Sequence, residues 1–181
     1  LDAAQVGLVM SSGPAVAALS GAPAGRLVDR FGAYRMGVGG LLVMAIGAAT
    51  LPWLAGWWGV AGYVGPLMLV TAGYALFQAA NNTAVMVDVA PERRGVASGL
   101  LNLSRNLGLI TGASLMGLLF ALGATTGDIA ASGPTSAVAG MQITFGVATG
   151  LIMLALMLAY LGRTRVAARA GQRSPGKATA P

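Results

Sequence analysis

The amino-acid sequence predicts an all-α, polytopic membrane protein with five transmembrane helices. Hydrophobic residues make up 56% of the chain and charged residues only 9%, whereas soluble domains carry about 25% charged residues. Five stretches are mostly apolar over about 20 residues or more, the length that crosses a bilayer as a helix. They lack the alternation of apolar and polar residues that is typical of membrane β-barrels. These observations together favour a helical bundle in lipid.

The five expected spans make up one partial transmembrane domain, residues 1–162. They cover residues 4–24, 34–54, 62–89, 95–122 and 140–161. Pro14, Pro23 and Pro66 lie in or near spans and predict kinks, which neighbouring helices in a bundle tolerate. Residues 163–181 consist mainly of Ala, Arg, Gly and Pro, with Lys and Ser, and are too polar to pack. We expect them to form a basic, disordered cytoplasmic tail.

The basic residues predict how the bundle is oriented. The segments after the first, third and fifth spans hold all 11 Lys and Arg residues except Arg105. Basic segments stay in the cytoplasm, so we expect an outer N-terminus and a cytoplasmic C-terminus in the plasma (inner) membrane. Trp57 and Trp58 belong to an aromatic cluster at the opposite side, which is typical of a membrane interface. This placement favours contact with the lipid bilayer, not nucleic acid, despite a pI near 10.8.

The residue types that are missing exclude several kinds of chemistry. The sequence has no Cys and no His, which excludes disulfides, thiol and imidazole catalysis, and metal sites built from those residues. No nucleophile–base pair or phosphate-binding loop is present either. We therefore expect no enzyme activity, no metal and no cofactor.

Polar residues mark the third and fourth spans as different from the others. A step of about 100° per residue puts them on one face of each helix. The candidate cavity-facing residues are Tyr74, Gln78, Asn81, Asn102, Arg105 and Asn106. Polar groups at membrane depth are costly unless they face protein or water. Either hydrogen bonds between helices or contacts with a substrate would explain the amide side chains on these helices.

Arg105 is the most informative of these residues. It lies about 15 Å into the membrane from Gly95, at 1.5 Å per helical residue. An Arg at the centre of a span costs roughly 2.5–3.5 kcal/mol on insertion scales. It is either a cavity-lining cation that contacts substrate or a carboxylate, or a structural residue bound to backbone carbonyls.

Two sequence stretches carry a family resemblance. Residues 25–35 read GRLVDRFGAYR, which resembles the cytoplasmic signature of the major facilitator superfamily. Residues 91–108 read PERRGVASGLLNLSRNLG, which resembles the loop before the eleventh helix in its drug:proton antiporter branches. The glycines of the signature suit close approach and a tight turn, and its Asp suits the positive N-terminus of a facing helix.

The resemblance implies five helices from the C-terminal half of a major facilitator fold. They match helices eight to twelve of twelve, or the last five of fourteen. The motif and its charge relay would comprise Gly25, Asp29, Arg30, Gly32, Arg35 and Asp88. This chain departs from the signature at Ala33, where the family has an Arg, and Arg35 is the expected substitute.

The resemblance also implies a function for the complete transporter. We expect a secondary active transporter that moves small organic molecules, by proton-coupled efflux, together with the missing N-terminal half of the same protein. The acids all lie near span ends: Asp2, Asp29, Asp88, Glu92 and Asp128. A coupling carboxylate would then belong to the missing part. An uptake symporter and a non-transporting membrane module, or pseudotransporter fragment, remain as alternatives.

Overall fold

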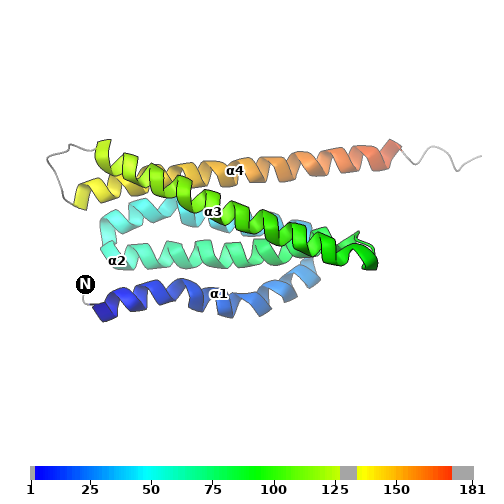
Figure 1. Ribbon diagram of the computed structural model, residues 1–181, viewed down its shortest axis with the longest axis horizontal. Helices are drawn as coiled ribbons and strands as arrows, with labels where there is room; N and C mark the ends of the chain where they lie inside the picture. The colour runs from blue at the N-terminus through cyan, green and yellow to red at the C-terminus, as the bar shows by residue number, and fades with distance from the viewer. Residues whose placement is uncertain (1–2, 127–133, 173–181) are drawn as a thin grey trace, which may run out of the picture.

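The computed structural model describes residues 3–126 and 134–172. Within them the chain is all-helical. The elements are α1 (Ala3–Phe31), α2 (Ala33–Val87), the single-turn 3-10 helix η1 (Pro91–Arg93), α3 (Arg94–Thr126) and α4 (Pro134–Gln172). The long helices run roughly along one common direction, as Figure 1 shows.

The expected count of five helices is not matched, because two expected spans form the single element α2. A straight helix of its 55 residues would be about 80 Å long, far more than the roughly 30 Å of a bilayer core. The helix avoids this length by turning back at Gly59, whose φ of 58° and ψ of −130° are not helical. Figure 1 shows the two arms of α2 side by side. Residues 33–58 are called the first arm below, and residues 60–87 the second arm.

Glycines hold the two arms of α2 in close contact. A Cβ added at Gly40 would lie 2.6 Å from the backbone nitrogen of Phe77, and one at Gly47 would lie 2.9 Å from the carbonyl oxygen of Pro66. Gly62 lies directly against the carbonyl group of Leu54. The backbones approach this closely only because no side chain stands between them. The first arm also holds the most deeply buried large side chain of the described residues, Leu51.

The helix α1 packs on α2 through buried Ala24 and Val28. Three segments of the described residues are long and apolar enough to cross a membrane: α2, Pro91–Gly123 and Val138–Gly162. The expected first span, 4–24, is helical, but several side chains at its start lie outside the described residues, so this criterion does not test it.

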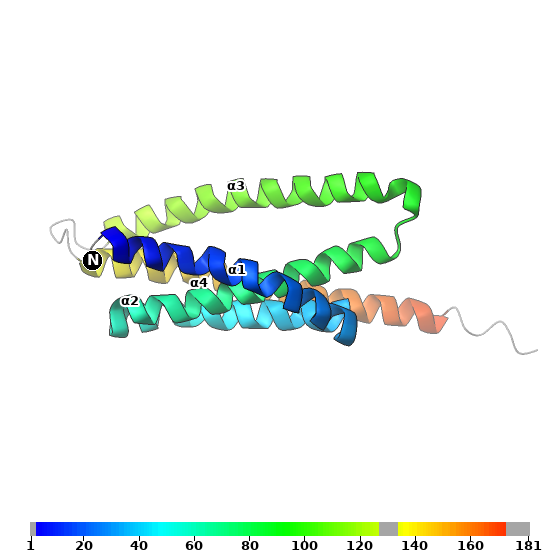
Figure 2. The same cartoon turned by 90° about the horizontal axis from the view of Figure 1, so that it is seen from below.

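The last two helices cross closely at one point. A Cβ at Gly123 of α3 would lie 2.9 Å from the Cα atom of Gly140 in α4. Within the described residues α3 contacts α4 and hardly touches α2, and Figure 2 shows α3 apart from the other helices over much of its length away from this crossing.

The helix α4 extends beyond the expected end of the last span. It continues to Gln172, through residues 163–172, for which the sequence predicts a disordered tail. Ala and Arg dominate that stretch, and both are strong helix formers. Residues 173–181 lie outside the described residues, so the tail prediction is not tested there.

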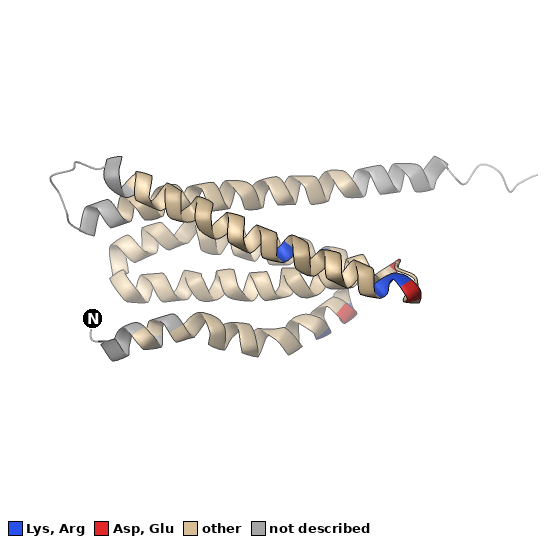
Figure 3. Cartoon of the chain, in the orientation of Figure 1, with Lys and Arg blue, Asp and Glu red and all other residues tan. Residues whose placement is uncertain are grey.

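The charged residues gather at one end of the bundle. Figure 3 shows them where α1 ends and α3 begins, with one basic residue partway along α3. That residue is Arg105, since the only other charged residue of α3 is Arg94 at its start. This end is called the charged end below. Exposed Trp57 and Trp58 lie next to the Gly59 turn at the other end, as an aromatic interface belt would.

Candidate functional site

A polar cleft lies between the second arm of α2 and helix α3. Its volume is about 470 Å³, which is within the range of small-molecule sites. Its lining residues come from these two elements alone: Tyr74, Phe77, Gln78, Asn81, Asn82, Met86, Ser98, Leu101, Asn102, Ser104, Arg105, Gly108 and Leu109. The cleft forms where α3 stands away from α2.

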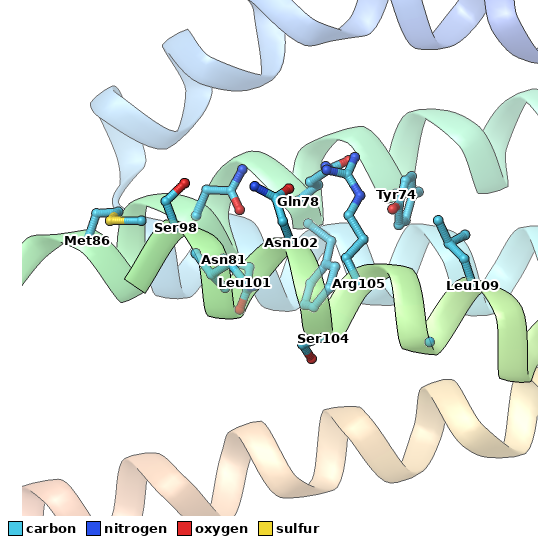
Figure 4. A pocket seen from close by; sticks show the side chains of 13 residues that line it. Tyr74, Gln78, Asn81, Met86, Ser98, Leu101, Asn102, Ser104, Arg105 and Leu109 are labelled. Carbon is cyan, nitrogen blue, oxygen red and sulfur yellow. The ribbon is translucent and has the colours of Figure 1, made fainter. Parts of the chain in front are cut away.

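Five of the six predicted cavity-facing residues line this cleft. Tyr74, Gln78 and Asn81 are three and four residues apart on the second arm, so one helix face carries all of them. Asn102 and Arg105 have the same spacing on α3. Figure 4 shows both side chains reaching from α3 toward α2, with the Arg105 side chain between those of Gln78 and Tyr74.

Asn106 does not line the cleft. It follows Asn102 by four residues, so its side chain is turned only about 40° from that of Asn102. The two residues therefore share one helix face in the sequence projection, but Asn106 lies just beyond the edge of the face that lines the cleft.

The polar lining groups have no partners within the described residues. No hydrogen bond or ion pair engages the side chains of Gln78, Asn102 or Arg105 there. The threonines of α2 differ, since Thr71, for example, donates to the carbonyl of Leu67 at 2.9 Å. The cleft therefore presents free hydrogen-bond donors and acceptors, whereas the Thr71 hydroxyl group is hydrogen-bonded within its own helix.

The charge of the cleft is positive. Arg105 is its charged lining residue, and no acid lines it. Within the described part of the chain the acidic residues Asp29, Asp88 and Glu92 lie at the charged end, away from Arg105. Asp2 and Asp128 lie outside the described residues.

Several further lining residues are not among those predicted from the sequence. Asn82, Ser98 and Ser104 are polar and line the cleft as well. Apolar Phe77 and Met86 carry no polar signal, so only the fold reveals their place.

Comparison with known proteins identifies the family. The profile described as Major Facilitator Superfamily matches residues 1–180. The chain belongs to the major facilitator superfamily. A relative in Escherichia coli (strain K12), named Uncharacterized transporter YebQ, is 34% identical over 115 residues, which are 64% of this chain and 25% of that protein. The match thus spans a quarter of that relative's length. No solved structure matches the chain.

The major facilitator superfamily comprises multi-pass membrane transporters of small molecules, and the relative is named a transporter as well. The apolar helices of this chain fit that setting. The sequence resemblance to the superfamily is therefore confirmed.

The signature motif of the superfamily forms a helix end and a one-residue turn. The turn is Gly32, whose φ of 87° favours glycine, and α2 begins directly after it. The Gly32 amide donates to the carbonyl of Val28 at 2.9 Å. Gly25 has open space where a side chain would be, so the close approach expected there is not formed by the described residues.

The charged residues of the motif lie at the charged end but do not pair with each other. No ion pair joins Asp29, Arg30, Arg35 or Asp88 within the described residues. The Arg30 guanidinium instead lies 5.3 Å from the centre of the Phe31 ring. The charge relay therefore stays a prediction.

Both acids of the predicted relay stand at the unfavourable end of a helix. Asp29 lies in the last turn of α1, and Asp88 caps the C-terminus of α2. A helix C-terminus carries partial negative charge, so each carboxylate gains from a cation or from the N-terminus of another helix.

Proposed function

We propose that this chain is the C-terminal part of a secondary active transporter that moves small organic molecules by proton-coupled efflux. The cleft between α2 and α3 is the observation that carries the proposal, since it presents unpartnered polar groups on helices that are long and apolar enough to cross a membrane. Transporters of this kind bind substrate near the membrane midplane between two repeats. The missing N-terminal half would close the open side of the cleft.

The orientation of the chain follows from its charges. The charged end faces the cytoplasm of the plasma (inner) membrane, because basic segments are retained there. The aromatic residues beside Gly59 then lie at the outer surface, and the C-terminus lies inside.

The proton carrier belongs to the rest of the transporter. The acidic residues among the described part of this chain lie at the charged end. A carboxylate that couples proton movement to transport must instead lie on the substrate pathway. Asp29, Arg30, Arg35 and Asp88 instead form the cytoplasmic charge relay that couples helix movement between conformations.

Everted membrane vesicles carrying the complete transporter test this function. Respiration acidifies their interior, and acridine orange fluorescence reports the pH gradient. Ethidium, rhodamine 6G, fluorescein and nalidixate are added in turn. Efflux by antiport predicts that at least one compound enters the vesicles while protons leave. Proton movement in the same direction as the compound would indicate an uptake symporter, and no movement of any compound would indicate a non-transporting module.

A further inference from the structure

The electrostatics of the cleft point to a substrate class. The lining contains one guanidinium, several amides and no carboxylate. Within the described residues nothing neutralises Arg105, which makes no ion pair and no hydrogen bond there. A cation at membrane depth is costly without a partner. The ligand that best completes this site is therefore an anion.

The geometry of the lining narrows this anion to a planar acid group. A guanidinium binds a carboxylate through two parallel N–H donors. Figure 4 shows the side chains of Gln78, from α2, and Asn102, from α3, beside the Arg105 side chain. Their amide groups can donate to the remaining lone pairs of a carboxylate.

The remaining lining is apolar and aromatic. Phe77 and Met86 of α2 and Leu101 and Leu109 of α3 line the same cleft. A volume of about 470 Å³ accommodates a molecule of a few rings. The apolar side chains can thus hold a hydrophobic body while Arg105 holds its charged group.

We infer that the cleft between α2 and α3 binds amphipathic organic anions, with Arg105 pairing their carboxylate. This inference rests on the proposed function in that it assigns the substrate class to the same cleft. The inference is narrower than the proposed function. A transporter of cations or neutral compounds would satisfy the proposed function but would contradict the inference.

Three probes of the same shape but different charge provide the test. Binding of 2-naphthoate, 2-naphthamide and 2-naphthylmethylammonium to the purified complete transporter is measured by calorimetry. The expected order has 2-naphthoate tightest. A hydrogen bond to a charged group is worth roughly 10-fold to 100-fold in affinity, so Arg105→Gln should weaken 2-naphthoate by about that factor. Its effect on 2-naphthamide should stay within about 2-fold.

Two further variants make the test specific. Arg105→Lys keeps the charge but not the paired donors, so it should restore part of the affinity for 2-naphthoate. Arg93→Gln removes one positive charge at the charged end, outside the cleft, and should change no affinity. Equal effects of Arg93→Gln and Arg105→Gln on 2-naphthoate binding would overturn the inference. The overall positive potential of the protein would then explain the preference for the anionic probe.

The outcomes separate the inference from the proposed function. Tightest binding of the ammonium probe, or equal binding of all three, would overturn the inference; a carboxylate from elsewhere in the transporter would then neutralise Arg105. Transport of ethidium together with such a result would leave the proposed function standing. Binding of 2-naphthoate lost in Arg105→Gln, with no transport of any compound, would support the inference and contradict the proposed function.

Discussion

The two arms of α2 and helix α3 show two different ways of placing an apolar helix. The arms bury each other along a glycine-lined contact, with Gly40, Gly47 and Gly73 against opposing backbone atoms. In α3, by contrast, Gly123 is the buried residue among those whose side chains are described. Both segments are long and apolar enough to cross a membrane, so hydropathy does not explain the difference.

The difference lies in which partner each helix has within this chain. The hairpin of α2 carries both halves of its interface, so its contact is complete. The helix α3 presents large apolar residues such as Leu100, Leu103 and Leu107 to its surroundings. Those surfaces suit lipid or the rest of a transporter, and the same separation opens the polar cleft. The four predictions below test this contrast in the complete transporter.

The largest effect is expected inside the α2 hairpin. A Cβ at Gly40 would lie 2.6 Å from the backbone nitrogen of Phe77. A backbone atom cannot relieve this clash by a rotamer change, as a side chain can. Overpacking of this kind costs about 1–3 kcal/mol. Gly40→Val should therefore lower the melting temperature and the monodisperse fraction on size-exclusion chromatography. Gly99→Val on α3, which has open space, is the control, and an equal loss there would contradict the contrast.

The next effect concerns the turn between α1 and α2. Gly32 has a φ of 87°, where an ordinary side chain costs about 1–3 kcal/mol. Gly32→Ala should lower the melting temperature of the transporter, and Gly32→Asn should lower it about as much, because a ψ of 146° lies outside the left-handed helical region that Asn tolerates. Gly25→Ala should not lower it, since that helical position has room. A harmless Gly32→Ala would show that the turn is not required.

A smaller effect separates two neighbouring amides of α3. Asn102 lines the cleft and Asn106 does not. Loss of one hydrogen bond costs about 0.5–1.5 kcal/mol, which is roughly 2-fold to 10-fold in affinity. Asn102→Leu should raise the apparent KM for transport by about that factor, and Asn106→Leu should leave it unchanged. The reverse result would place the substrate on another face of α3.

The smallest effect is a stabilisation. Gly99 lies in a helix with open space around it, and Ala is better than Gly in a helix by about 0.5–1 kcal/mol. Gly99→Ala should raise the melting temperature slightly, whereas Gly123→Ala should lower it because of the Gly140 backbone. If Gly99→Ala were destabilising, a helix from outside this chain would pack there.

Sequence patterns predicted the helical class and most of the cleft, for identifiable reasons. Tyr74, Gln78, Asn81, Asn102 and Arg105 stand out because polar groups are rare in apolar helices, and their spacing alone puts them on two faces. The joining of two spans into α2 could not be predicted. The residues between them are apolar and remain helical, so the single change of conformation at Gly59 leaves no polar break in the sequence.

Close glycine contacts were equally hard to predict. Gly-x-x-x-Gly spacing marks Gly95 with Gly99 and Gly108 with Gly112, yet none of the four has a close neighbour among the described residues. Gly40 and Gly73, which do have close neighbours, lie on different arms. Such a contact depends on which helices meet, and this is a property of the fold.

The α2 hairpin has one more consequence, for how the chain enters the membrane. Residues 36–87 contain no Asp, Glu, Lys or Arg, and the turn at Gly59 lies near the middle of this neutral segment. Carrying an elementary charge across a membrane involves about 2.3 kcal/mol per 100 mV. The hairpin can thus be inserted as a pair of helices without electrical work, and the membrane potential neither drives nor opposes that step.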